Sequence, residues 1–318
     1  MDEAPQPVSH DKPLDNAFTL QKLEILCAVV AHGGVGRAAD ELFVSQPVVS
    51  AHIRSLEDKL GTRLFEKDGR GIRLTEAGEQ VHRWALDVLR SRRELSQTLQ
   101  HLRGGTAGSV AVAASMSAAN SVLTPILIDF RRAFRDVRVS VTNSSVEVAL
   151  ELTQSGRADF CLVGSDAVLD SRAYEAELVG RPSFVLIASV EDTTVPDRVS
   201  ATDLATLPFI TPPAGLAIRR SQEAALAELG VHNRRVELEL GSAEAIMQAV
   251  VAGLGVALLW RISAAAELAS GALREVHIDG TLQPDKLYVV TRAGKRLTPA
   301  QRQLKQAIVV RTPGLVDL

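Results

Sequence analysis

One segment, residues 38–61, constrains the fold of this chain more than any other: AADELFVSQPVVSAHIRSLEDKLG. It contains two short helical patterns on either side of a break of about three residues, and the second begins at Ser45, followed by Gln46 and Pro47. A serine before a proline is a strong helix start, because its hydroxyl can cap free backbone N–H groups and proline has no N–H to satisfy. Apolar residues then recur at steps of four, three and four, which predicts one apolar helix face: Val49, Ile53, Leu56 and Leu60.

The opposite face of this second helix carries small or hydrogen-bonding side chains: Ala51, Arg54, Ser55 and Asp58. Such a face suits a major groove, which is only about 12 Å wide. In a helix-turn-helix, the first residues of the recognition helix meet base edges, and its backbone N–H groups can lie near phosphate. We therefore expect Gln46, Pro47 and Ser50 to contact DNA. Taken alone, the helix could equally be an ordinary capped amphipathic helix with a solvated outer face.

The flanking sequence favours the DNA-binding interpretation. Upstream, apolar residues at helical spacing predict a first helix that ends at Gly33-Gly34: Leu23, Leu26, Cys27 and Val30. Downstream, Leu64-Phe65 and Ile72–Leu74 flank a glycine-bearing basic tip, which predicts a β-hairpin. Together these elements predict a winged helix-turn-helix. Lys67 and Arg70 would reach phosphate or the minor groove from the wing, although each could also belong to a solvated turn.

A long helix is predicted from Thr75 to about Leu102. Its apolar positions are spaced alternately four and three residues apart: Val81, Ala85, Val88, Leu95, Leu99 and Leu102. Arg92 occupies the one position of this pattern that is not apolar. Such a heptad pattern is typical of a helix that packs along a partner helix, so we expect a dimer seam. The alternative is a helix that lies on its own domain. A dimer would present two heads to a palindromic site.

The run from Leu20 to Trp84 resembles the DNA-binding domain and linker helix of the LysR-type transcriptional regulators, through RAADELFVSQPVVSAHIRSLEDKLGTRLFEKDGRGIRLTEAGE. The resemblance implies base or groove contacts from Gln46, Pro47 and Ser50, and backbone contacts from Arg37 and Arg70. Ala51 and His52 stand where the family commonly has arginine and glutamine, so we expect a different target sequence. The full predicted DNA-binding set is Arg37, Ser45, Gln46, Pro47, Ser50, Ala51, His52, Arg54, Lys67 and Arg70.

Charge limits how this head can bind DNA. Residues 18–103 carry 13 Lys and Arg against 11 Asp and Glu, a net charge of +2, within a chain of net charge −3. A protein that coats DNA without specificity would be far more cationic. We therefore expect affinity to rest on specific contacts and on the geometry of a homodimer or homotetramer, with phosphate attraction as support.

Other function classes lack their sequence signatures. The chain has no HExxH, paired CxxC, GxSxG or P-loop lysine, which argues against an enzyme, a metal site or a bound cofactor. No apolar run approaches 18 residues, and residues 1–17 look like a disordered tail without the apolar stretch of a signal peptide, so we predict a cytoplasmic protein without membrane contact. Cys27 and Cys161 are expected to be reduced packing residues, with a thiol sensor as the alternative.

Beyond a predicted glycine hinge at residues 104–108, short apolar runs alternate with helical patterns. We expect strands near 110–114, 137–141, 160–163, 184–188, 209–210, 236–240, 256–259, 273–278 and 287–290, and helices near 122–134, 146–154, 221–229, 243–251 and from 298. Repeated strand–helix–strand units predict parallel sheets covered by helices. The GxG within Gly253–Gly255 follows a helix and lacks the third glycine of a dinucleotide site.

This half resembles the effector-binding region of LysR-type regulators, itself similar to periplasmic solute-binding proteins. The resemblance implies an α/β fold: a winged helix-turn-helix at 18–75 (helix-turn-helix about 35–54), a linker helix at 76–103, and two Rossmann-like α/β subdomains, 108–166 plus 270–318 and 167–269. A pure solute-binding module is a rival interpretation, against which the winged head and the missing export signal argue.

Ligands of parallel-sheet domains bind at strand carboxyl ends, where helix amino termini favour anions. The loops there carry small, mostly polar residues, and by position they match the cleft-lining loops of the family: Ser115, Met116, Ser117, Asn143, Ser144, Ser145, Gly164, Ser165, Thr211, Pro212 and Ser242. Each serine alone could be a simple helix cap. We predict a small-molecule effector, a carboxylate or other anionic metabolite, in a cleft between the subdomains. The chain is thus interpreted as a ligand-responsive transcriptional regulator that binds double-stranded promoter DNA.

Overall fold

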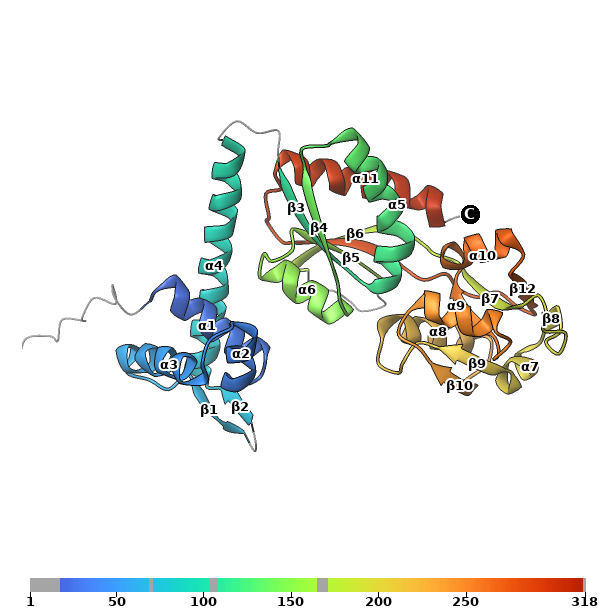
Figure 1. Cartoon of the computed structure of the whole chain (residues 1–318), viewed down its shortest axis with the longest axis horizontal. Coiled ribbons are helices and arrows are strands. Elements are labelled where there is room, and N and C mark those ends of the chain that lie inside the picture. The colour runs from blue at the N-terminus through green and yellow to red at the C-terminus, as the bar shows by residue number, and fades with distance from the viewer. Residues whose placement is uncertain (1–17, 69–70, 103–107, 165–170, 317–318) are drawn as a thin grey trace, which may run out of the picture. The chain divides into compact units, whose positions relative to one another are not determined.

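The computed structural model describes residues 18–68, 71–102, 108–164 and 171–316 (Figure 1). The chain divides into two compact units, Met1–Ser96 and Gln97–Leu318, and each is described by itself. Several predicted features lie outside the described residues: the tail at 1–17, Arg70 at the wing tip, most of the glycine hinge, and Ser165.

The first unit contains the predicted helices and hairpin. Its elements are α1 (Leu20–Ala31), α2 (Val35–Glu41), α3 (Gln46–Leu60), β1 (Phe65–Asp68), β2 (Gly71–Leu74) and most of α4 (Glu76–Leu102), whose last residues belong to the second unit. The two strands pair antiparallel, with Phe65 opposite Leu74. The predicted apolar face of α3 is turned inward, because Val49, Ile53 and Leu56 are buried in the core of this unit.

Two residues, Glu57 and Gly78, fix the wing to the helices. The Glu57 carboxylate, buried near the end of α3, accepts hydrogen bonds from the backbone N–H of Leu64 (2.8 Å) and of Phe65 (3.3 Å). In the first turn of α4, a Cβ on Gly78 would lie 2.0 Å from the Leu64 carbonyl oxygen, so only glycine allows this close approach. The hairpin is therefore anchored at the end of α3 and at the start of α4.

The first half of the predicted seam along α4 packs against the helix's own unit, which was the alternative interpretation of this stripe. Ala85 and Leu89 are buried in the core of the first unit, and Val81 and Val88 pack against the same core. Heptad spacing gives a helix an apolar stripe but does not say which surface covers it. Other apolar side chains of α4 are open to a partner, because Trp84 is 43% exposed, Leu95 58% and Leu99 46%.

The second unit contains a five-stranded sheet with the order β4-β3-β5-β13-β6. These strands are β3 (Ser109–Ala114), β4 (Arg138–Asn143), β5 (Phe160–Gly164), β6 (Tyr174–Gly180) and β13 (Leu287–Arg292). β4, β3 and β5 run parallel, and β13 runs antiparallel to both β5 and β6. The helical elements of this subdomain are η2 (Ala118–Leu123), α5 (Thr124–Ala133), α6 (Val146–Gln154) and α11 (Pro299–Val316).

A second subdomain contains two smaller sheets, with the orders β11-β7-β12-β8 and β10-β9. The strands are β7 (Phe184–Ser189), β8 (Arg198–Val199), β9 (Pro208–Thr211), β10 (Arg235–Glu239), β11 (Ala257–Trp260) and β12 (Leu273–Ile278). The helices are α7 (Ala201–Thr206), α8 (Ala217–Glu228), α9 (Ala243–Val251), η3 (Arg261–Ala264) and α10 (Ala265–Ser270). An isolated parallel bridge between Phe209 and Val256 joins the two sheets.

The predicted parallel sheets and the predicted subdomain limits differ from this topology. β7 pairs antiparallel with β11 and β12, so only the β9–β10 pair, the β8–β12 pair and part of the larger sheet are parallel. β12 belongs to the second subdomain although it lies after residue 270, and β6 belongs to the first although it lies after residue 167. Apolar runs mark strands but not their partners, and the sequence analysis missed β6, β8, α7 and α10 altogether.

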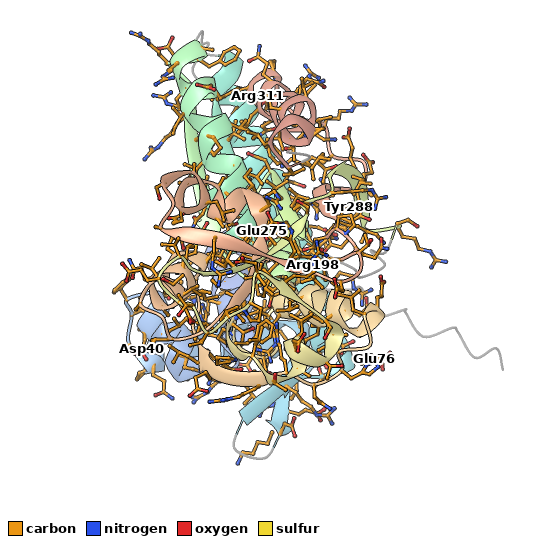
Figure 2. All side chains as sticks on the ribbon, turned by 90° about the vertical axis from the view of Figure 1, so that its right-hand side faces the viewer. Asp40, Glu76, Arg198, Glu275, Tyr288 and Arg311 are labelled. Carbon is orange, nitrogen blue, oxygen red and sulfur yellow. The ribbon has the colours of Figure 1, made fainter. Side chains whose placement is uncertain are left out.

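Two ion pairs tie the closing segment of the chain to the first subdomain. Arg311 lies on α11 (Figure 2). It donates to Asp129 on α5, with an N–O distance of 2.6 Å. Lys295, between β13 and α11, lies 2.8 Å from Asp159, and both side chains are buried. The late return of the chain thus completes the core of the subdomain in which the second unit begins.

Candidate functional site

The leading end of α3 is exposed on the surface of the first unit. Ser45 occupies the N-cap position with an extended backbone, and Gln46 and Pro47 form the first turn. All three side chains are exposed. The predicted capping role of the Ser45 hydroxyl is wrong, because it makes no cap hydrogen bond. These side chains therefore project from the start of a helix whose opposite face is buried.

The rest of the predicted contact set lies along the same helix or close to it. Ala51 and Arg54 are exposed, whereas Ser50 and His52 are half-buried. On the neighbouring position, the Ser55 hydroxyl accepts a hydrogen bond of 3.0 Å from Lys22 Nζ. Lys67 is exposed on β1, and Arg70 lies outside the described residues.

Arg37 has a local structural role in addition to its predicted backbone contact. Its Nη2 donates to the carbonyl oxygen of Gly33 at 2.7 Å, just beyond the end of α1. The cation thereby satisfies a carbonyl group at the negative end of that helix. The Arg37 side chain remains exposed.

The turn between α2 and α3 has an apolar tip that the sequence analysis missed. Phe43 is 95% exposed and has a φ of 54°, in the left-handed region that favours glycine. Val44 and Val48 beside it are also exposed. Alternation of apolar and polar residues gave no signal here, because an exposed aromatic residue in a turn follows no periodic pattern.

The second unit holds a cavity of about 260 Å³, called here the effector cavity. Nine of the ten predicted effector-binding residues that the structure describes line it: Ser115, Met116, Ser117, Asn143, Ser144, Ser145, Gly164, Pro212 and Ser242. The first seven lie at or just beyond the carboxyl ends of β3, β4 and β5, and the last two come from the second subdomain. The cavity therefore lies between the two subdomains of the unit.

Two helices, α6 and α9, begin at this cavity. Ser145 accepts a hydrogen bond from Val148 N–H at the start of α6, and Ser242 accepts one from Ala245 N–H at the start of α9. The simple capping role that each serine could have is thus correct for these two. The pKa of Glu147, in the first turn of α6, lies below its usual value chiefly because its own backbone N–H donates to the carboxylate. Free N–H groups at this end stabilise an anion.

The apolar wall of the cavity was not predicted. It includes Trp260, Leu259, Ile246, Leu216 and Ile218. Trp260 is only 2% exposed, and its indole lies close to the end of β5, where a Cβ on Gly164 would be 3.3 Å from Trp260 Cζ2. These residues follow ordinary core spacing in the sequence, so nothing local distinguishes a cavity wall from a filled core.

Asp285 is a second residue that the sequence analysis missed. Its buried carboxylate accepts hydrogen bonds from Trp260 Nε1 (3.1 Å), from the Ser221 hydroxyl (3.1 Å) and from the Lys286 backbone N–H (2.8 Å). Asp285 lies just before β13, in the segment that returns from the second subdomain to the first. It holds the indole in the cavity wall at the point where the chain crosses between subdomains.

Thr211 is the predicted effector residue that does not line the cavity. Its side chain is buried, and its hydroxyl accepts hydrogen bonds from Arg219 Nη1 (3.0 Å) and Arg234 Nη2 (2.9 Å). Successive side chains of an extended segment point to opposite faces. Pro212 therefore faces the effector cavity while Thr211 faces away from it.

Thiol and metal chemistry find little support in the described part of the chain. Burial raises the pKa of both Cys27 and Cys161 to about 11, so both thiols are protonated and unreactive near neutral pH. Among the described residues, no three His, Cys, Asp or Glu side chains gather where they could hold a metal ion. Nor does any helix in those same ranges have the length and apolar character needed to cross a membrane.

Two domain families of known proteins match successive parts of the chain. The bacterial regulatory helix-turn-helix protein domain of the lysR family matches residues 20–79, and the LysR substrate binding domain matches residues 103–311. The first match contains α3 and the wing. The second contains every described residue that lines the effector cavity.

Individual relatives match over similar lengths. The chain is 30% identical over 299 residues to a probable RuBisCO transcriptional regulator of Nostoc sp., covering 93% of this chain and 89% of the relative. It is 30% identical over 294 residues to the RuBisCO operon transcriptional regulator of Allochromatium vinosum, covering 92% and 95%.

Solved structures share the fold at lower identity. Full-length OxyR from Pseudomonas aeruginosa, a cysteine-to-aspartate variant, has a TM-score of 0.65 at 19% identity and covers 94% of this chain and 97% of its own. Full-length CbnR, solved in complex with its target DNA, has a TM-score of 0.61 at 19% identity and covers 92% and 99%.

Proposed function

Because this chain belongs to the LysR family of bacterial transcriptional regulators, we propose that the leading end of α3 contacts promoter DNA and that the effector cavity binds the signal. Regulators of this family combine a DNA-binding domain with an effector-binding domain and act as oligomers. The observation that carries the proposal is the convergence of small polar loops on one cavity, within the domain that the family uses for small molecules.

On the DNA side, we propose that Gln46, Pro47 and Ser50 meet base edges in the major groove. Gln46 and Pro47 are exposed at the first turn of α3, and Gln46 offers both a donor and an acceptor. Four cations would contact the phosphate backbone: Arg37, Arg54, Lys67 and Arg70. Such contacts position the head on DNA without reading its sequence. Ala51 and His52 distinguish the target site from those of relatives with longer side chains there.

The effector that fits the cavity best is a small carboxylic acid with an apolar body. Among the described lining residues there is no Lys, Arg or His, and the one charged side chain, Asp285, already accepts hydrogen bonds from three protein donors. An anion would therefore be held away from Asp285, by the helix amino termini and hydroxyl groups. The apolar wall around Trp260 and Ile246 would cover the rest of the ligand.

Regulation follows from the position of the cavity between two subdomains. A ligand that binds one relative arrangement of the subdomains more tightly shifts the equilibrium towards it. We propose that this shift changes the spacing of the DNA-binding heads in the oligomer, which we take to be a homotetramer built from dimers joined through α4. We further propose that the protein acts in the cytoplasm and is not an enzyme.

The DNA contacts are tested by Gln46→Ala and Ser50→Ala. Each should cost about 1–3 kcal/mol on the cognate promoter if the side chain reads a base. Gln80→Ala removes an exposed glutamine from α4 and serves as the control, with no change expected. Equal losses on cognate and random DNA would show that Gln46 and Ser50 position the backbone and do not read sequence.

The effector cavity is tested by a screen of small carboxylic acids for ligands that raise the midpoint of thermal unfolding. Ser144→Phe places a large side chain in the cavity and should abolish the stabilisation by any acid that binds there. DNase footprints of the wild type should change when the same acid is added. A footprint that stays the same with saturating acid would disprove the proposed link between the cavity and DNA binding.

A further inference from the structure

A second cavity of about 280 Å³ lies beside α8 in the second subdomain. It is called here the arginine cavity, and its lining consists of Arg219, Glu223, Leu226, Ala227, Val231, His232, Asn233 and Arg234. None of these residues lines the effector cavity. Its size is close to the lower end of ligand pockets, about 300 Å³, which suits a small ligand.

The two arginines of this cavity lie side by side because they share one acceptor. Arg219 Nη1 and Arg234 Nη2 both donate to the Thr211 hydroxyl, at 3.0 and 2.9 Å. Two guanidinium groups at this distance repel one another, and burial together with Arg219 lowers the pKa of Arg234 to about 10. The Arg234 guanidinium is therefore still charged near neutral pH.

Both arginines lie near the Glu223 carboxylate, which favours the charged form of Arg234 through space, but only Arg219 is paired with it. Arg219 forms ion pairs with Glu223 and, at 3.5 Å, with Glu239. Arg234 donates to neutral oxygens, those of Thr211 and of Gln222 (3.2 Å), and its guanidinium lies 4.9 Å from the centre of the Phe209 ring. Within the described residues, its Nε and Nη1 are buried without a hydrogen-bond partner.

A largely buried cation with two unsatisfied N–H groups is unfavourable unless an anion neutralises it. The charge of a guanidinium strengthens its hydrogen bonds to the oxygens of phosphate and carboxylate, and Nε and Nη1, which lie on different edges of the group, can each donate to one such oxygen. His232 and Asn233, both exposed in the lining, add polar groups that can donate to the same ligand.

We propose that the arginine cavity is a second anion-binding site of this chain, which takes a phosphate-like oxyanion through Arg234. The site is separate from the effector cavity but close to it in space. Arg219 Nη1 also donates to the Pro212 carbonyl oxygen at 2.9 Å, and Pro212 lines the effector cavity. Only the carboxyl end of β9, at Thr211 and Pro212, therefore separates an anion bound at Arg234 from a ligand in the effector cavity.

Inorganic phosphate is the probe for this site, titrated into the full-length protein by isothermal calorimetry at constant ionic strength. The wild type should show saturable binding that sulfate competes for and chloride does not. Arg234→Gln should raise the Kd by about tenfold or more, since it removes a charged hydrogen-bonding group. The adjacent Arg235 is exposed and paired with Glu237, so Arg235→Gln is the matched control and should leave the Kd unchanged.

Three results would overturn the proposal: no saturable phosphate binding in the wild type, an equal loss in Arg235→Gln, or a loss of binding in Ser144→Phe. The last result would place phosphate in the effector cavity and would leave the proposed function intact. Should Arg234→Gln fail to fold, Asn233→Asp tests the same point from an exposed position. Its added carboxylate at the cavity should weaken phosphate binding, whereas unchanged binding would exclude the site.

Discussion

The leading end of α3 and the effector cavity both present polar groups, but the chain builds them in opposite ways. The predicted contacts on α3 fall within ten consecutive residues, from Ser45 to Arg54, on one helix with a buried opposite face. The effector cavity draws its lining from Ser115 through Asp285, across two subdomains. A surface made by one helix is visible in local periodicity, whereas a cavity depends on which distant segments meet.

This difference explains how much could be predicted from the sequence. The winged head and the polar loops of the effector cavity were predictable, because helix caps and strand ends have local signatures such as Ser145 before α6 and Ser242 before α9. The roles of Trp260 and Asp285 could not be predicted. In the sequence Trp260 looks like an ordinary core residue, and Asp285 looks like a loop residue until β13 is placed beside β5. Strand partners were equally hidden, which is why β12 was assigned to the wrong subdomain.

The two tryptophans of the chain provide the sharpest test of the comparison. Trp260 is buried in the cavity wall, whereas Trp84 in the first unit is 43% exposed and packs edge-on against Phe18 at 4.5 Å. Trp260→Ala should lower the free energy of unfolding by about 3–5 kcal/mol, because it leaves a large void. Trp84→Ala should cost about 1 kcal/mol.

Urea unfolding followed by circular dichroism measures both values. Similar losses for the two variants would contradict the view that the cavity wall is a part of the core. A smaller loss for Trp260→Ala alone would mean that the second unit closes over the missing indole.

In the head, the corresponding buried anchor is the Glu57 carboxylate. Glu57→Ala leaves the backbone N–H groups of Leu64 and Phe65 without their acceptor, so it should cost about 1–3 kcal/mol of stability. Asp58 is exposed and adjacent, which makes Asp58→Ala the matched control, with a change within about 0.5 kcal/mol. The free energy of unfolding is again the measurement. Equal losses in Glu57→Ala and Asp58→Ala would show that the Glu57 carboxylate does not anchor the wing.

The smallest expected effect concerns the exposed turn before α3. Phe43 is the one non-glycine residue with positive φ among the described residues, and an L-residue with a bulky side chain is strained there. Phe43→Gly relieves this strain but also adds freedom to the unfolded chain, so we expect a net gain of about 1 kcal/mol or less. Val44→Gly lacks the positive φ and should lose stability, which makes it the control. A gain in stability together with a loss of promoter affinity would show that the head retains a strained aromatic residue for its contact with DNA. A loss of stability in Phe43→Gly would show instead that the Phe43 side chain packs against the head, and the strain argument would fail.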